Sequence, residues 1–274
     1  MTPFDRRDLL RLAAVGAAGS LTAACSDRTA TPAAAGSTAP VSSAAPASSA
    51  GAAPAGSTTA AAAPGASAAP SLAAGLPFEI RSGPGTGDAV ALTFHGQGDP
   101  AIARALLAEA ARADARITVM AVGTWLDQQP EMARLVLDGG HELGNHTEHH
   151  LPISTMSADH AYAEIAACGA RLKQLTGSIG RWFRPSQAQD CTATVAAQAR
   201  RAGYAHCLSY DLDSLDYTDP GATAVTRTVL DAVRPGSVVS LHFGHSGTVA
   251  ALPAILDGLH RRGLRAVTTS ELLS

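Results

Sequence analysis

Short apolar runs alternate regularly with segments of helical periodicity from residue 88 to the end of the chain. The runs have the length of buried strands, and the segments between them place apolar residues three and four positions apart. Turn and cap signals agree with this division, because Asp99 and Ser157 can begin helices and Gly203 and Gly263 can end them. A chain that alternates in this way predicts parallel strands with helices outside the sheet.

We expect an α/β fold, a distorted (β/α) barrel of about seven parallel strands, because that number of strand–helix repeats favours a barrel over an open sheet. The expected strands are Ala89–Phe94, Ile117–Val122, Glu142–Asn145, Gly180–Arg184, His206–Tyr210, Ser237–His242 and Arg265–Val267. The expected helices are Asp99–Ala113, Thr124–Leu137, Ser157–Leu175, Ala193–Ala202, Ala222–Val233 and Thr248–Arg262.

The first part of the chain has a different composition. Residues 1–25 resemble a twin-arginine export signal that ends in a lipoprotein cleavage box at Cys25. Residues 26–75 are almost only Ala, Pro, Ser, Gly and Thr, which cannot bury enough surface to offset the entropy of ordering, so we expect a disordered tether. Residues 76–274 are then one domain. The expected product is an exported lipoprotein, held to the membrane by lipid on Cys25 and facing the cell wall.

Charge and cysteine content restrict the partners and the kind of metal site. The net charge of −3 comes from 20 basic and 23 acidic residues and offers no basic face, so nucleic acid is not an expected partner. The domain contains three cysteines, Cys168, Cys191 and Cys207. In an exported protein we expect Cys191 and Cys207 to form a disulfide, and the alternative is that all three are buried thiols. There is no Cys-x-x-Cys pair, so a thiolate zinc site is not expected.

Residues 140–150 hold four of the ten histidines. His146 and His150 are four positions apart, and two imidazoles on one helical turn can bind the same divalent cation. Several polar side chains also follow directly on expected strands, at the edge where barrels carry their active groups. These residues are His95, His146, Arg184, Asp211, Asp213 and His242. The sequence therefore predicts a metal site at the carboxyl edge of the sheet.

The segment His146-Thr147-Glu148-His149-His150 resembles the His-Ser/Thr-x-x-His metal motif of the polysaccharide deacetylases, also called the NodB-homology family. Four further segments resemble the other family motifs in the family order: Ala89–Phe94 with the residues after it, Phe183-Arg184-Pro185, Asp211–Tyr217 and Ser240-Leu241-His242. The resemblance runs from about Asp88 to Leu273. It implies hydrolysis of N- or O-acetyl groups on a cell-wall polysaccharide or a peptidoglycan-type substrate. It also implies a divalent metal, for which zinc is the first expectation and cobalt or nickel the alternatives.

The resemblance also assigns roles to residues of this chain. His146 and His150 would be metal ligands, Arg184 and Asp213 would orient or tune the catalytic groups, and His242 would be the general acid that protonates the leaving amine. The first family motif is Thr-Phe-Asp-Asp-Gly, in which the first Asp is the general base and the second completes the metal triad. This chain departs from it, with His95 and Gly96 at those two positions.

Three interpretations of this departure stay open. In the first, His95 is the third metal ligand and another group is the base. In the second, Asp99 supplies the missing metal carboxylate and His95 is a catalytic base near neutral pH. In the third, hydrolysis is lost and the domain is a glycan-binding module. Hydrolysis of another non-peptide carbon–nitrogen bond is a further alternative. The sequence does not indicate an oligomeric state.

Overall fold

Strand β2 (Ala89–Gly96) is the central element of the sheet in the computed structural model, which describes residues 70–274. It pairs in parallel with β3, β8 and β9, and its side chains from Val90 to His95 are buried. A strand covered on both faces requires mostly apolar side chains, and the buried hydroxyl of Thr93 is satisfied because it donates to the Val239 carbonyl oxygen at 2.7 Å. The expected export signal, Cys25 and residues 26–69 of the expected tether lie outside the described residues.

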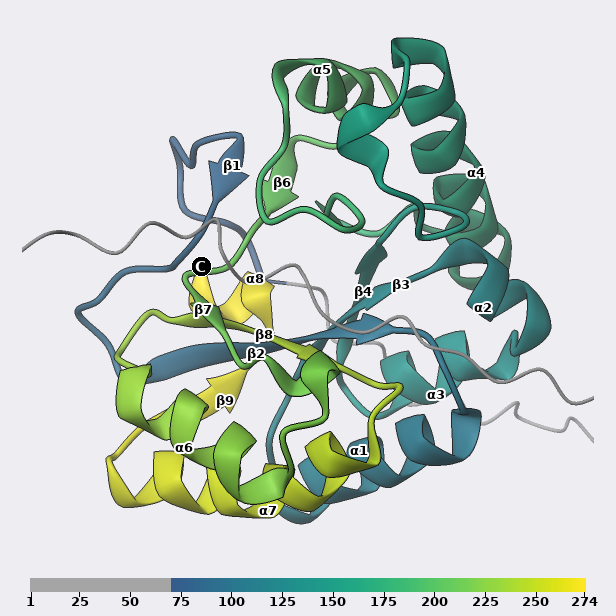
Figure 1. The fold of residues 1–274 in the computed structure, drawn as a ribbon. Helices are drawn as coiled ribbons and strands as arrows, with labels where there is room; N and C mark the ends of the chain where they lie inside the picture. The colour runs from purple at the N-terminus through teal and green to yellow at the C-terminus, as the bar shows by residue number, and fades with distance from the viewer. Residues whose placement is uncertain (1–69) are drawn as a thin grey trace, which may run out of the picture. The chain divides into compact units, whose positions relative to one another are not determined.

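Nine strands form the sheet within residues 70–274, in the order β1-β6-β5-β4-β3-β2-β8-β7, with β9 paired to β2 (Figure 1). Besides β2 they are β1 (Glu79–Ile80), β3 (Thr118–Ala121), β4 (Glu142–Asn145), β5 (Trp182–Phe183), β6 (His206–Leu208), β7 (Leu212–Asp213), β8 (Val238–His242) and β9 (Arg265–Val267). All the ladders between them are parallel. Since β1 and β7 end this order without pairing to each other, the sheet is a curled, incomplete barrel, and the predicted fold class is confirmed.

Helices cover the outside of the sheet. They are α1 (Pro100–Arg112), α2 (Gly123–Gln128), α3 (Glu131–Asp138), α4 (Ala158–Thr176), α5 (Ala193–Arg201), α6 (Ala222–Ala232), α7 (Ser246–Arg261) and α8 (Thr269–Leu272). In Figure 1, α6, α7 and α1 lie side by side along one side of the sheet, whereas α4 packs on α5 and α2 elsewhere. Within the described part of the chain, no helix is both long enough and apolar enough to cross a bilayer.

The predicted helix Thr124–Leu137 is wrong as a single element. The chain forms α2, leaves helical geometry at Gln129 with φ −135° and ψ 61°, and begins α3 after Pro130. The ring of a proline disfavours the helical conformation in the residue before it, which accounts for the break. The two strands that the sequence did not predict, β1 and β7, are two residues long and therefore carry no readable periodicity.

The parallel register brings the carboxyl ends of β2, β3, β4, β5 and β8 to one edge. His95 on β2 lies opposite His242 on β8, while Asn145 at the end of β4 lies opposite Phe183 at the end of β5. His95, His146, Arg184 and His242 therefore meet at this edge, as the sequence predicted. The prediction is wrong for Asp211, which precedes β7 and accepts a hydrogen bond of 2.7 Å from the Val238 amide at the beginning of β8.

Candidate metal centre

Three imidazoles meet at the carboxyl edge of the sheet. His95 lies near the end of β2, His146 follows β4 directly, and His150 lies four residues further along the loop. One ring nitrogen from each lies within 4.8 Å of the other two. The ring centroids of His95 and His146 are 4.3 Å apart, and those of His146 and His150 are 4.8 Å apart. The three rings are therefore close enough to share one cation.

The segment from His146 to His150 is not the helical turn on which the sequence argument relied. Thr147 and His150 both have left-handed backbone, with φ values of 67° and 56°. Local hydrogen bonds hold this shape: Asn145 Oδ1 accepts from the Thr147 amide at 2.9 Å, and Thr147 Oγ1 accepts from the His150 amide at 3.2 Å. The two imidazoles converge because the loop curls back on itself. They lie together as the spacing of four predicted, but a curled loop and not a helical turn brings them together.

The nitrogens that face the centre lack hydrogen-bond partners. His95 Nδ1, His146 Nε2 and His150 Nε2 are all buried and unpaired. A buried polar atom without a partner is costly, so three of them side by side call for a ligand that accepts their lone pairs. The other nitrogen of His146 bonds the carbonyl oxygen of Arg184 at 3.0 Å, which fixes the ring with Nε2 toward the centre. This set fits a divalent cation that prefers imidazole ligands.

Burial also keeps these rings neutral. Desolvation lowers the pKa of His95 and of His146 well below the usual 6.5, and repulsion from the neighbouring imidazoles lowers both further. Burial, followed by the charge of His242, lowers the pKa of His150 in the same direction. A neutral imidazole offers the lone pair that a metal requires, whereas a protonated one does not. The centre is therefore in the ligating state at neutral pH.

Position 96 has no room for a side chain. A Cβ atom on Gly96 would lie 2.8 Å from Val119 Cγ1 and 3.1 Å from the Cα of Ala121. Successive residues of a strand point to opposite faces of the sheet, so a side chain at position 96 would point away from the centre that His95 faces. His95 Nε2 lies 3.2 Å from the hydroxyl of Ser240 on the neighbouring strand. His95 is thus the side chain that β2 contributes to the centre.

Asp99 lies apart from the three imidazoles. It is exposed and forms the N-cap of α1, where Oδ1 accepts a hydrogen bond of 2.8 Å from the amide of Ala101. Pro100 follows at the first helical position, so the local sequence favours this capping role. Asp99 is not a member of the described group of three possible ligands. The geometry favours His95 over Asp99 as the third donor.

His242 stands beside the three imidazoles and is paired with a buried carboxylate. Its ring centroid is 4.2 Å from that of His95, and its Nδ1 lies 2.7 Å from Asp216 Oδ1. Asp216 Oδ2 also accepts from the His242 amide at 2.8 Å and from the hydroxyl of Thr248 at 2.7 Å. Burial alone would raise the pKa of Asp216, but the hydrogen bonds and charge of His242, together with the Thr248 bond, lower it overall. The carboxylate therefore stays ionised and can support a protonated imidazole.

Sequence reasoning did not single out Asp216, whose place before a turn suggested a structural role as readily as a functional one. The signal that could have found it is topological. Strands β7 and β8 are parallel neighbours, so the loop after β7 must pass the end of β8, where His242 lies. Asp213, which the sequence did propose, accepts a hydrogen bond of 3.0 Å from the Leu215 amide in that same loop. It shapes the loop that presents Asp216.

Arg184 is fully buried beneath the centre. Its Nε and Nη2 donate to the carbonyl oxygens of Leu208 and Ser209 at 2.8 and 3.0 Å, while Nη1 has no partner. Burial lowers its pKa to about 10, which still leaves the guanidinium charged at neutral pH. Its own carbonyl oxygen holds His146. Arg184 therefore links β6 to a ring of the centre.

Large apolar side chains are exposed around this edge. Leu151, Leu215 and Tyr217 are 46%, 44% and 48% exposed, and they are the large exposed apolar residues of the described chain. Each is a sequence neighbour of a residue of the centre, and the Tyr217 ring lies 5.4 Å from that of His242. The Tyr217 ring is thus an exposed apolar surface beside His242.

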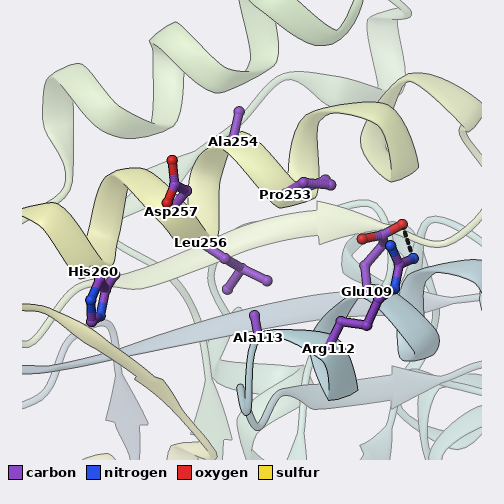
Figure 2. Close-up of a pocket in the computed structure, with 8 residues that line it drawn as sticks. All are labelled: Glu109, Arg112, Ala113, Pro253, Ala254, Leu256, Asp257 and His260. Carbon is purple, nitrogen blue, oxygen red and sulfur yellow. Dashed lines mark hydrogen bonds and ion pairs between the residues drawn. The ribbon is translucent and has the colours of Figure 1, made fainter.

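A hollow of about 540 Å³ lies elsewhere, between α1 and α7 (Figure 2). Its lining includes the Glu109–Arg112 ion pair, Pro253 and His260. None of its lining residues is among the buried, unpaired polar groups found within residues 70–274. This hollow therefore holds none of the unpaired buried polar groups that gather at the edge of the sheet.

Comparison with known proteins gives the family. The family model described as polysaccharide deacetylase matches residues 82–207. A peptidoglycan-N-acetylglucosamine deacetylase of Bacillus cereus is 34% identical over 188 residues, a match that covers 67% of this chain and 87% of that protein. The chain belongs to the polysaccharide deacetylase family. The predicted resemblance is thereby confirmed.

Two further matches extend the comparison. A chitooligosaccharide deacetylase of a Bradyrhizobium species is 30% identical over 169 residues, covering 53% of this chain and 73% of the relative. The crystal structure of a protein described as a CE4 family pseudoenzyme, from Bacillus anthracis, superposes with a TM-score of 0.68 at 23% identity. That match covers 73% of this chain and 70% of the other and shows that the fold is shared.

Proposed function

We propose that this protein is a metal-dependent deacetylase that hydrolyses acetyl groups on a cell-wall or related polysaccharide. One observation carries the proposal: three buried and unpaired imidazole nitrogens converge at the sheet edge beside the His242–Asp216 pair. The first feature suits a metal and the second suits proton transfer, and hydrolysis of an acetamide needs both. Membership of the polysaccharide deacetylase family supports the same reaction.

His95, His146 and His150 would hold the metal, and zinc is the ion that we propose. A three-histidine set is one of the ligand sets of catalytic zinc sites, which keep a further position open for water or substrate. When bound, the ion would polarise the acetyl carbonyl group and acidify a water molecule. Because all three ligands are neutral, we expect weaker metal binding than a set that includes a carboxylate would give.

The acid–base work would fall to His242, since His95 is used as a ligand in this arrangement. The Nδ1–H of His242 donates to Asp216, which leaves Nε2 with a lone pair. In the first step Nε2 takes a proton from the attacking water as the oxygen–carbon bond forms. In the second step Nε2–H gives that proton to the amine nitrogen as the carbon–nitrogen bond breaks. Acetate and a free amine result, and Asp216 stabilises the imidazolium between the steps.

Arg184 and Asp213 would position the other groups. Arg184 holds His146 through its carbonyl oxygen, and its unpaired Nη1 carries positive charge beneath the centre. Asp213 shapes the loop that carries Asp216. Neither residue needs to touch the substrate in this role, so their replacement should loosen the centre without removing a reacting group.

The relatives and the exposed apolar residues support a polysaccharide substrate. Two of the relatives are named as deacetylases of peptidoglycan N-acetylglucosamine and of chitooligosaccharides. The faces of sugar rings are apolar, and Tyr217, Leu151 and Leu215 would offer surfaces on which they can pack. We also propose that the protein is exported and anchored through lipid on Cys25, which would place the domain beside such a polymer.

The test is acetate release from an oligomer of N-acetylglucosamine by the purified full chain. We expect release that stops when a chelator removes the metal and returns when zinc is added. The variant His146→Ala should lose both metal and activity. The matched control is His160→Ala, an identical change on the exposed face of α4, which should keep both.

A glycan-binding module without hydrolysis is the second candidate. It is favoured by the absence of any carboxylate from the described group of three possible ligands. Stoichiometric zinc without acetate release, together with retained binding of the oligomer, would support this candidate and overturn the hydrolase proposal.

A further inference from the structure

Two cysteines are in contact between β6 and the segment that leads into α5. Cys207 is a fully buried residue of β6, and Cys191 is a half-buried residue just before α5. Their sulfur atoms are 2.6 Å apart. The third cysteine of the described chain, Cys168, is buried in α4, where its thiol donates to the carbonyl oxygen of Ala121. Only the first two can meet without rearrangement of the backbone.

The surroundings of this pair favour a bond between the sulfurs over a metal. Glu79 on β1 is the third possible ligand nearby. Its carboxylate is already engaged, because Oε1 accepts from the Arg81 guanidinium and Oε2 accepts from the Cys191 amide at 3.1 Å. A disulfide leaves these bonds intact and needs no third group.

We propose that Cys191 and Cys207 form a disulfide when the folded protein meets a disulfide oxidant. The more exposed Cys191 thiolate attacks the oxidant, forms a mixed disulfide and releases one thiol. The sulfur of Cys207 then attacks the sulfur of Cys191, which releases the second thiol. Two protein thiols lose their protons and are oxidised, and one small-molecule disulfide is reduced to two thiols.

This disulfide would act as a clamp, by which we mean that it holds the loop after Arg184 against β6, beside the metal centre. Cys207 immediately precedes Leu208 and Ser209, whose carbonyl oxygens hold the Arg184 guanidinium. On the other side, the Ser209 hydroxyl donates to the carbonyl oxygen of Gln189 at 2.7 Å, close to Cys191 in the chain. The bond therefore fixes the loop after Arg184 to the strand that carries the partners of Arg184.

Peptide mapping tests whether the bond forms. The full chain, folded and incubated with oxidised glutathione, is denatured, alkylated without reduction and digested with trypsin. Cleavage at Arg residues places the two cysteines on different peptides, 182–200 and 202–227. We expect these peptides to be joined and to separate on reduction. Alkyl groups or glutathione on both cysteines would overturn the proposal.

Thermal unfolding tests the clamp. A closed loop of this length predicts that the Tm falls by about 6–12 °C when the oxidised protein is reduced. Cys191→Ser should melt at the lower temperature and be insensitive to reductant, whereas Cys168→Ser should keep the response. A joined peptide pair with a Tm that reductant does not change would refute the clamp.

Discussion

Replacing His95 and Asp99 separately distinguishes the two possible third ligands. His95 lies near the end of the central strand β2 and Asp99 lies in the loop after it, and the sequence allowed either to complete the metal site. In the structure His95 has an unpaired nitrogen in the centre, whereas Asp99 caps α1 through Ala101. We therefore expect His95→Ala to impair metal binding and Asp99→Ala to impair only stability.

The expected sizes follow from these contacts. Partners that merely orient a ligand are worth about 10- to 100-fold in metal affinity, so loss of a ligand should raise the zinc Kd by more than about 100-fold, or about 2.8 kcal/mol. Asp99→Ala removes a helix cap worth about 1 kcal/mol, which corresponds to about 2–4 °C in Tm for a domain of this size.

The assay is competition for zinc between each variant and a chromophoric chelator at neutral pH. Circular dichroism of the metal-free proteins checks that His95→Ala folds, and His160→Ala serves as the matched control. Equal zinc affinity in His95→Ala and the wild type, or a loss in Asp99→Ala as large as that expected for His95→Ala, would refute the three-histidine assignment.

Three further perturbations test the proton-transfer pair, the buried His141 and the close approach at Gly96. Asp216→Asn should lower acetate release about 10²- to 10⁴-fold with zinc content unchanged, because His242 loses the charge that supports its protonated form; zinc lost along with activity would contradict this. Burial, with the charge of Arg116, lowers the pKa of His141 from the usual 6.5 to about 4. As the pH falls from 6.5 to about 4, the His141 imidazole is protonated in the unfolded chain but not yet in the folded protein. About 2–3 kcal/mol of the free energy of unfolding should therefore be lost in this pH range. In urea unfolding, the stability of His141→Gln should depend less on pH than that of the wild type. An identical pH dependence in the two proteins would argue against this role of His141. Gly96→Ala should cost about 1–3 kcal/mol in urea unfolding, because its Cβ meets β3, and an unchanged midpoint would contradict the close approach.

The sequence predicted the elements that carry strong periodicity. The apolar run of β2 and the amphipathic pattern of α4 need no tertiary information, and both elements lie where they were expected. The strands β1 and β7 could not be read because two residues hold no pattern, and they form only where a neighbouring strand offers hydrogen bonds. The break between α2 and α3 was within reach, since Pro130 carried the signal.

The sequence predicted where the metal centre lies but did not decide which residue is its third ligand. His146 and His150 carry a spacing that indicates a shared ion, although the loop between them is not helical. The choice between His95 and Asp99 depends on how the chain leaves β2. Gly98 turns it with a φ of 96°, at a position where a Cβ would lie 2.7 Å from Gly244 in another loop. That contact joins parts of the chain distant in sequence, so local spacing could not reveal it.

X-ray absorption spectroscopy of the zinc-loaded full chain tests the three-histidine metal centre most directly. We expect a first coordination shell that includes three imidazole nitrogens at about 2.0–2.1 Å, and a shell with one imidazole fewer in His95→Ala. A wild-type shell with two imidazoles and a protein carboxylate, or a spectrum that His95→Ala leaves unchanged, would contradict it.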